Sequence, residues 1–344
     1  MKIIDLRSDT VTKPNNDMLK AMIESDLGDD VYFEDPTVNL LQNKIAQLFG
    51  KEEALFMPSG TMANQVALLV NTNTGDEVIV ESDSHIFYYE TAGPSILSRI
   101  QLRPIKSSNG EMNIDEIKNA IRDDIYYLPK TSLICLENTH NRHGGMIITQ
   151  EYINKVAEIA KENNLKMHLD GARIWNAHKA THIPLHQMVE KFNTISVCFS
   201  KGMGTPVGSI LIGSKEDIKK AIKWRKILGG GLRQVGLLAG ACLYALDHNL
   251  DKIDIDNQNA KFFANELIKS SRISLNIDKI HTNIVTFKIE DKINPNDFVT
   301  KCKVKGILLM HIGDNKIRTV VHLDLTKDML LEASKIIKSI LEEL

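Results

Sequence analysis

One lysine stands in a setting that suits covalent chemistry. Lys201 follows an apolar alternation of Ile195, Val197 and Phe199 and begins the run KGMGTPVGS, which is rich in small residues. A surface lysine needs no such neighbours, whereas a lysine at the end of a buried strand can form a Schiff base with an aldehyde. The alternative is a strand-end lysine with a purely structural part.

Two further features suit the same chemistry. Asp170, in HLDGAR, ends an apolar run and is followed by Arg173. Its carboxylate either pairs with that arginine in a buried loop or holds a proton on a heterocyclic nitrogen. Gly60 and Thr61 follow Ser59 at an expected helix start, where free amides and the helix dipole favour an anion such as phosphate. A helix cap without a ligand is the alternative there.

Together the three features predict a pyridoxal phosphate site. The phosphate would lie at the helix start, the ring nitrogen at Asp170 and the aldehyde at Lys201. A carboxylate about 4 Å from the ring nitrogen, at an effective dielectric constant near 20, contributes about 4 kcal/mol, or roughly three pKa units. That is enough to keep the nitrogen protonated, so the combination is far more specific than any of its parts.

The elements that must position these residues alternate along the chain. Hydrophobic periodicity predicts helices over 40–49, 59–70, 115–122 and 151–163, and strands over 54–57, 77–81, 100–105, 133–137, 166–169, 195–199 and 209–212. This order predicts an α/β fold with a mostly parallel sheet flanked by helices. Ligands bind at the carboxyl ends of such strands, where Asn138, Asp170, Ser200 and Lys201 fall.

The last hundred residues predict a smaller α+β domain. Beyond a polar stretch at 247–254 we expect a helix over 257–270, strands over 284–289, 307–312 and 316–322, and a helix from Lys327. We therefore expect an N-terminal arm and large domain over 1–247 and a small domain over 248–344. The apolar stretch 228–246 is interpreted as one buried helix, because Arg233 and two glycines interrupt it.

Composition excludes several function classes. The 344 residues carry a net charge of −2, which does not favour a nucleic acid or an anionic membrane as partner. The N-terminus lacks the apolar core of a signal peptide. The four cysteines are scattered without zinc or disulfide spacing, so we expect reduced thiols, no metal and a cytoplasmic location.

Over nearly its whole length the chain resembles the low-specificity L-threonine aldolases, which belong to the fold type I group of pyridoxal phosphate enzymes. The motifs that carry the resemblance are DLRSDTVTKP, GDDVYFEDPT, PSGTMANQ, LENTHN, HLDGARIWNA, FSKGMGTPVGS and GGGLRQVG. The resemblance implies a retro-aldol cleavage of L-threonine and L-allo-threonine to glycine and acetaldehyde. Relaxed specificity for other β-hydroxy-α-amino acids is expected as well.

The resemblance also assigns roles at the cofactor. Lys201 matches the lysine that binds the cofactor aldehyde, Asp170 the partner of the ring nitrogen, and Gly60 and Thr61 the phosphate site. His85 matches the histidine that stacks on the ring. It is the leading candidate to deprotonate the substrate hydroxyl, with the released Lys201 as the alternative.

Other matches concern the substrate and the assembly. Ser8, Arg173 and Arg318 match the groups that bind the substrate carboxylate, a task that suits the planar guanidinium. Arg173 also matches a residue that lies near the 3′-oxygen of the cofactor. Lys226 and Arg233 match residues that reach the phosphate of a neighbouring subunit. The resemblance therefore implies a homo-oligomer, a dimer of dimers, with shared active sites.

Two positions depart from the family pattern. Tyr126 stands where relatives often carry a histidine near the substrate hydroxyl, and we expect it to bind substrate with an altered preference or lower turnover. Phe33 stands where relatives often carry glycine. A ring there would narrow the entrance to the site or repack a subunit contact.

Three other functions fit the same residues. The chain could be a β-eliminating lyase or an aminotransferase on the same fold, since one fold supports several reactions. It could cleave a different β-hydroxy amino acid, such as β-phenylserine. It could also bind the cofactor without catalysis, which turnover of any amino acid would exclude.

Overall fold

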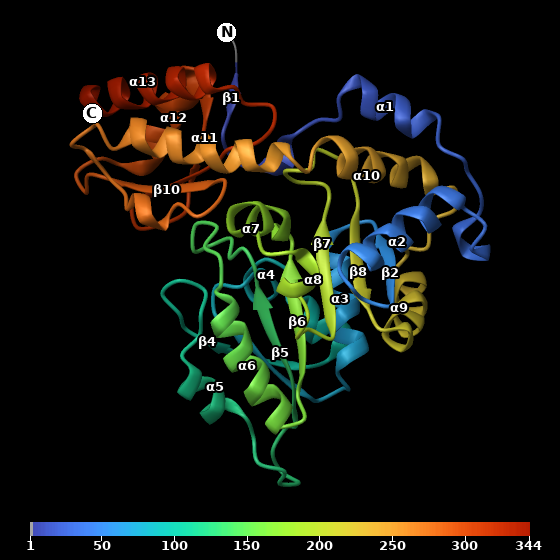
Figure 1. The fold of residues 1–344 in the computed structure, drawn as a ribbon. Helices are drawn as coiled ribbons and strands as arrows, with labels where there is room; N and C mark the ends of the chain where they lie inside the picture. Colours follow the sequence, from blue (N-terminus) through green and yellow to red (C-terminus); the bar gives the residue numbers. More distant parts are fainter. Residues whose placement is uncertain (1–2) are drawn as a thin grey trace.

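A seven-stranded sheet forms the centre of the larger of two parts (Figure 1). The structure is a computed structural model and describes residues 3–344. The strands lie in the order β2-β8-β7-β6-β5-β3-β4, and β8 is antiparallel to both of its neighbours while the others run parallel. The predicted α/β fold with a mostly parallel sheet is confirmed. The strand bounds are β2 Glu53–Met57, β3 Glu77–Glu81, β4 Gln101–Ile105, β5 Thr131–Glu137, β6 Lys166–Gly171, β7 Thr194–Cys198 and β8 Ser209–Gly213.

Helices cover both faces of this sheet, because alternate strand residues are apolar on each face. Leu55 and Leu211 pack with helices α3 and α9, and Val78 packs with α3 and α4. Phe56 and Ile134 pack on the opposite face, where α2, α6, α7, α8 and α10 lie. The helix bounds are α1 Asn16–Ile23, α2 Pro36–Leu48, α3 Gly60–Asn71, α4 His85–Tyr88, α5 Ile114–Ala120, α6 Gln150–Glu162, α7 Ile174–Thr181, α8 Leu185–Met188, α9 Lys215–Ile227 and α10 Gly236–His248.

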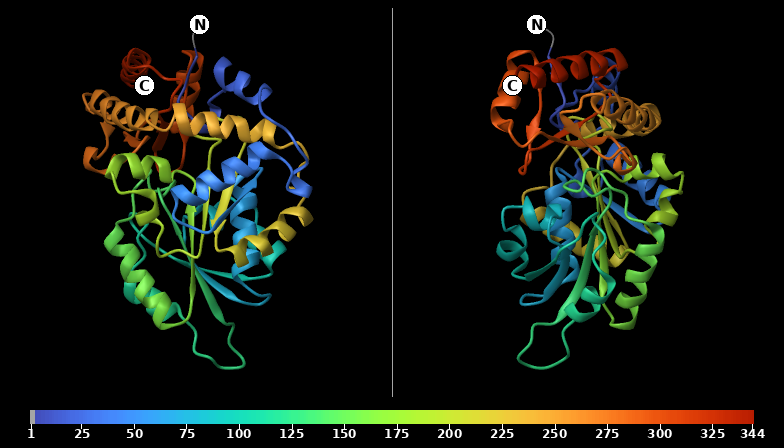
Figure 2. Two further views of the ribbon diagram at one scale, coloured as in Figure 1. Left: turned by 45° about the vertical axis from the view of Figure 1, so that its right-hand side comes forward. Right: turned by 90° about the vertical axis from the view of Figure 1, so that its left-hand side faces the viewer.

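The smaller part has its own sheet and core (Figure 2). Its antiparallel sheet has the order β12-β13-β10-β9, formed by Met310–His311, Lys316–Val320, Ile284–Ile289 and Ile273–Ser274. Three helices pack on it: α11 Lys252–Leu267, α12 Pro295–Val304 and α13 Lys327–Glu343.

The N-terminal arm joins the small part. Strand β1, Ile4–Asp5, pairs in parallel with β11, Ile307–Leu308. Ile4 and Leu6 are buried in the core of the small part. The arm therefore crosses the boundary that we placed at residue 247, and that division of the chain stays a prediction.

Three sequence-based expectations need correction. The helix expected over 228–246 begins only at Gly236, because residues 229–235 form a loop in which Gly229 has a φ of 81°. The helix expected over 257–270 is α11, which begins at Lys252, inside the polar stretch 247–254, and ends at Leu267. The strand expected over 307–312 is divided into β11 and β12, which pair in different sheets. No helix in residues 3–344 is long and apolar enough to cross a membrane.

Candidate active site

A cavity of about 440 Å³ lies at the carboxyl ends of the central strands, between the two parts of the chain. Its lining includes the end of β5, the end of β6, the segment after β7, the start of α3, the N-terminal arm and β13. The structure brings most of the predicted site residues together there: Ser8, Gly60, Thr61, His85, Asp170, Arg173, Lys201 and Arg318.

Asp170 is a buried carboxylate at the end of β6. Its Oδ2 accepts a hydrogen bond from the Asn64 amide at 2.8 Å, and its Oδ1 accepts one from the backbone of Ala172 at 3.1 Å. Burial raises the pKa of Asp170, but His85 and Lys201 outweigh it and hold the pKa below its usual value. The side chain is therefore an anion that faces the cavity, as a protonated ring nitrogen requires.

His85 begins α4 and is fixed by two carboxylates. Its backbone amide donates to Glu137 at 2.6 Å, and its Nδ1 lies 2.8 Å from Glu90. Burial lowers the pKa of His85, but the hydrogen bond to Glu90 and the charges of Asp170, Glu90 and Glu137 raise it overall. Because Glu90 occupies Nδ1, Nε2 is the ring nitrogen left for a ligand in the cavity.

The start of α3 offers an anion site. Ser59 caps the helix, with its hydroxyl accepting from Met62 and its carbonyl from Ala63. The amides of Gly60 and Thr61 precede these bonds and have no partner within residues 3–344. Both residues line the cavity, so two free N–H groups and the positive end of a helix face it.

Lys201 stands at the start of a tight loop after β7. The Thr12 hydroxyl donates to the Lys201 carbonyl at 3.0 Å, which ties the arm to this loop. The Thr205 hydroxyl donates to Val207 at 2.9 Å, and the Ser209 hydroxyl donates to the Cys198 sulfur at 3.3 Å. The small and hydroxylated residues after Lys201 therefore fold the loop and leave the lysine lining the cavity.

Two arginines form the opposite wall of the cavity. Arg173 donates to both oxygens of Asp9 at 2.7 Å, and to Asn141 at 3.2 Å. Arg318 donates to Asn141 at 2.7 Å and to the carbonyl of Arg7 at 3.1 Å. Its Nε has no partner in the part of the chain that the structure describes. The planar fork of Arg173 is thus already occupied by a carboxylate, whereas Arg318 lines the cavity and is bonded only to a carbonyl and an amide oxygen within residues 3–344.

The charge on this wall is incompletely balanced. Burial and the neighbouring charge of Arg173 lower the pKa of Arg318 to about 10. Burial raises the pKa of Asp9, but Arg173, Lys201 and Arg318 hold it well below its usual range. One carboxylate therefore faces two buried guanidinium groups, which favours the binding of a further anion.

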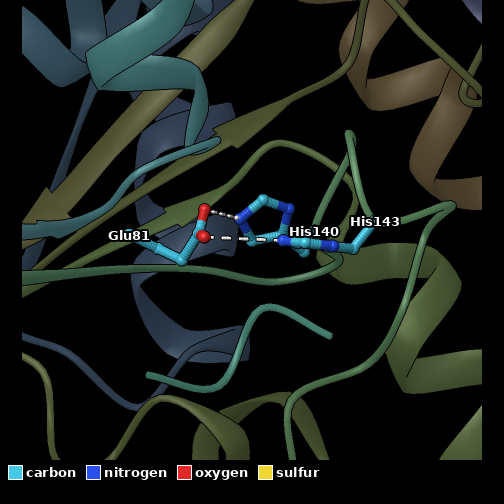
Figure 3. Close-up of side chains that lie close together, drawn as sticks. All are labelled: Glu81, His140 and His143. Atoms are coloured by element: carbon cyan, nitrogen blue, oxygen red, sulfur yellow. Dashed lines mark hydrogen bonds and ion pairs between the residues drawn. The ribbon is translucent and has the colours of Figure 1, made fainter. Parts of the chain in front are cut away.

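The loop that carries Asn141 is braced from β3 (Figure 3). His140 Nε2 lies 2.9 Å from one oxygen of Glu81, and His143 Nε2 lies 3.5 Å from the other. Glu81 and His140 are buried. Since His140 is next to Asn141, this cluster fixes the amide that contacts both Arg173 and Arg318.

Sequence reasoning assigned no role to several residues that shape the site. These are Asp9, Asn64, Glu90 and Asn141. Asp9, Asn64 and Asn141 lie inside motifs that carried the family resemblance, and Asp9 is next to Ser8, which was assigned. Glu90 had no such signal, because its partner His85 is fixed only by the fold.

Four residues singled out in the sequence lie outside the cavity lining: Lys226, Arg233, Phe33 and Tyr126. Lys226 is on the exposed surface of α9, and Arg233 is paired with Asp29 at 3.1 Å. Phe33 is 59% exposed and has a left-handed backbone with a φ of 61°. It does not narrow the entrance of its own chain's cavity. Its backbone conformation explains why glycine suits this position.

The prediction made for Tyr126 needs a correction. It is 99% exposed on the segment between α5 and β5, which loops out at the end of the molecule far from the small part (Figure 1). This segment precedes β5, whereas the cavity lies at the carboxyl end of that strand. The expectation that Tyr126 contacts substrate is therefore wrong for a cavity within one chain.

Comparison with known proteins places the chain in a family. The model of the beta-eliminating lyases matches residues 5–290. Low-specificity L-threonine aldolase 1 from Arabidopsis thaliana is 41% identical, with 95% of this chain and 93% of that protein aligned. Low specificity L-threonine aldolase from Escherichia coli K12 is 40% identical, with 96% and 97% aligned.

A solved structure shares the fold. The threonine aldolase of Leishmania major has a TM-score of 0.83 at 16% identity, covering 98% of this chain and 99% of that one. Fold and site thus define a pyridoxal phosphate enzyme of fold type I. The chain belongs to the beta-eliminating lyase family.

Proposed function

We propose that the protein cleaves L-threonine and L-allo-threonine to glycine and acetaldehyde with pyridoxal phosphate, and accepts other β-hydroxy-α-amino acids. One observation carries the proposal: a single cavity has a buried anion, Asp170, on one side and buried guanidinium groups on the other, with Lys201 in its lining. Relatives about 40% identical over most of the chain are named for this aldolase activity.

The residues present fit the cofactor. Asp170 would hold the ring nitrogen, the free amides of Gly60 and Thr61 the phosphate, and Lys201 the aldehyde carbon. Pyridoxal phosphate bound in this way supplies an electron sink for bond cleavage at the substrate α-carbon. His85 lies beside this position, against Glu90.

The chain's own groups then orient the substrate and move a proton. Arg318 binds the α-carboxylate, while Arg173 adds charge from its fixed place on Asp9. Because the carboxylate is held, the Cα–Cβ bond of the substrate has a fixed orientation in the cavity, and this orientation selects which bond breaks. His85 Nε2 takes the proton of the β-hydroxyl as the Cα–Cβ bond breaks, and a proton returned to Cα completes glycine.

A visible absorbance spectrum and an acetaldehyde assay test this function together. We expect purified protein to show a cofactor band that Lys201→Ala removes, and to release acetaldehyde from L-threonine, followed with alcohol dehydrogenase. Lys219→Ala, an exposed lysine outside the cavity, is the matched control and should behave like the parent. A band with ammonia and an oxo acid as products would identify a β-eliminating lyase instead, and no band would overturn the proposal.

We also propose a homo-oligomer in which Lys226 and Arg233 reach a neighbouring subunit's phosphate. Both are exposed outside their own chain's cavity. Light scattering of the holoenzyme should give a mass of at least twice 38.6 kDa. A monomer would contradict it.

The four buried, free cysteines support a reducing compartment, the cytoplasm, as the place of action.

A further inference from the structure

Asn64 lines the cavity, where it touches both carboxylates of the cofactor side. It is on α3 and 2% exposed. Its amide nitrogen lies 2.8 Å from Glu90 Oε1 and 2.8 Å from Asp170 Oδ2. Its amide oxygen lies 2.6 Å from the Ser196 hydroxyl and 3.2 Å from His168 Nε2. Every hydrogen-bonding position of this side chain is therefore used.

The surroundings fix the orientation of this amide. Ionised carboxylates only accept hydrogen bonds, so the NH₂ group must face Asp170 and Glu90. The oxygen then faces two donors. Burial lowers the pKa of His168 to about 4, so that imidazole is neutral. Since Nδ1 lies 2.9 Å from the Thr194 hydroxyl and can accept from it, the tautomer with its proton on Nε2 donates to Asn64. A flipped amide would leave both carboxylates facing an oxygen, at a high cost in free energy.

This arrangement answers an electrostatic difficulty. Asp170 and Glu90 are buried, and their nearest oxygens and His85 lie within 4.8 Å of one another. Two carboxylates so close in a buried site repel each other. His85 and Lys201 counter this repulsion at Asp170, and the Asn64 amide adds a donor that both carboxylates share.

We propose that Asn64 is a positioning residue whose single amide donates to both Asp170 and Glu90, holds the two carboxylates in place, and so links the ring-nitrogen site to the carboxylate behind His85. Ser196 and His168 hold the amide in place from the other side. The inference rests on the proposed contact between Asp170 and the ring nitrogen.

The test measures how well the site distinguishes a ring nitrogen from a carbon. Holoenzyme is equilibrated with a mixture of pyridoxal 5′-phosphate and its 1-deaza analogue, which keeps the aldehyde and phosphate but has C–H in place of the nitrogen. After trapping with borohydride, mass spectrometry of the Lys201 peptide gives the ratio of the two. We expect the parent protein to prefer pyridoxal phosphate by ~10-fold or more, since a hydrogen bond to a charged group is involved.

Asn64→Leu should reduce that preference by ~10-fold or more, because Asp170 loses a donor and keeps Glu90 as a neighbour. Asn257→Leu is the matched control. Asn257 is also buried in a helix, α11, and bonded to Asn176, but it does not line the cavity. It should leave the preference within about twofold. A purely structural role of Asn64 would weaken both ligands equally.

A double variant tests the link to Glu90. In a Glu90→Gln background, Asn64→Leu should cost at least about threefold less preference, because no second carboxylate remains. Additive effects would show that Asn64 does not bridge the two groups. If Asn64→Leu fails to fold, Ser196→Ala removes only one bond to the amide and should reduce the preference about threefold.

The outcomes separate the two proposals. A parent protein that does not distinguish the two ligands would overturn the placement of the ring nitrogen at Asp170. A parent that distinguishes them, together with variants of Asn64 and Ser196 that leave the preference unchanged, would overturn the role of Asn64 alone.

Discussion

The two sides of the cavity differ in how completely the protein satisfies their charges. On the cofactor side, Asp170 and Glu90 accept hydrogen bonds from Asn64, Gln65 and His85. On the substrate side, Arg318 has no carboxylate partner within the residues that the structure describes. The two carboxylates of the cofactor side are satisfied as folded, and the substrate side is left with capacity for an anion.

The two sides also differ in how the chain builds them. The cofactor side comes from α3, α4 and the end of β6, all within the large part. The substrate side joins the arm, the loop after β5 and β13 of the small part, so that Arg318 contacts Arg7 across 311 positions of sequence. The carboxylates of the cofactor side are thus arranged within one part of the chain, whereas the substrate side depends on how the two parts meet.

The largest effect is expected for a variant on the cofactor side. Asp170→Asn should reduce kcat for L-threonine about 1,000-fold, because roughly three pKa units of ring-nitrogen protonation are lost. Steady-state assays of acetaldehyde release measure it. Asp76→Asn, at a buried aspartate outside the cavity lining, is the control. A loss below tenfold would mean that the ring nitrogen is not at Asp170.

The second-largest effect is expected for a variant on the substrate side. Arg318→Lys should raise KM for L-threonine about 10- to 100-fold with a smaller change in kcat, since a charge-assisted hydrogen bond with fork geometry is lost. Arg272→Lys, in the small part and outside the cavity lining, should leave both constants unchanged. An unchanged KM for Arg318→Lys would assign the carboxylate to another group.

A pH profile sharpens the comparison at His85. The carboxylates around His85 raise its pKa above the usual 6.5, so the imidazole is charged at low pH and cannot accept a proton. We expect kcat/KM to fall about tenfold per pH unit below that pKa and to level off above it. Glu90→Gln should move this limb to lower pH. A profile that is flat between pH 5.5 and 8 would exclude His85 as the base.

Asp256, on α11, tests the electrostatics behind the substrate side. Burial and the negative charges of Asp9 and Asp324 raise its pKa to about 8, and its Oδ2 has no partner in residues 3–344. Because the pKa of Asp256 in the folded state lies above the unfolded value near 3.8, the protonated side chain contributes most to the stability of the fold below pH 3.8. This contribution is lost as pH rises toward 8.

The Asp256→Asn variant should therefore gain stability relative to the parent as pH rises. We expect about 1 kcal/mol or more at pH 8 and little at pH 4. Urea unfolding of the holoenzyme at both pH values measures this difference. An equal effect at the two pH values would show that Asp256 titrates normally.

The smallest effect lies outside both sides. Phe33→Gly should raise the free energy of unfolding by less than about 1 kcal/mol, because glycine adopts a positive φ without strain. Phe87→Gly, an exposed aromatic residue in α4, should instead destabilise. Thermal unfolding of both variants makes the comparison. A destabilised Phe33→Gly would indicate that the ring makes a subunit contact.

The sequence alone determined the elements and the chemistry of single residues. Helix α13 begins at Lys327 and strand β10 spans Ile284–Ile289 as predicted, because periodicity and caps are local properties. Lys201, Asp170 and the start of α3 were found as well, since strand ends and helix starts are recognisable in sequence.

Only the tertiary structure determined which polar side chains contact one another and which lie far from the cavity. Asp9 fills the fork of Arg173, Glu90 fixes His85, and Asn64 joins Asp170 to Glu90, all through contacts between distant segments. It also placed Tyr126 far from its own chain's cavity. Hydrogen bonding and burial act over a few ångströms in space, so no pattern along the chain could have determined these relations.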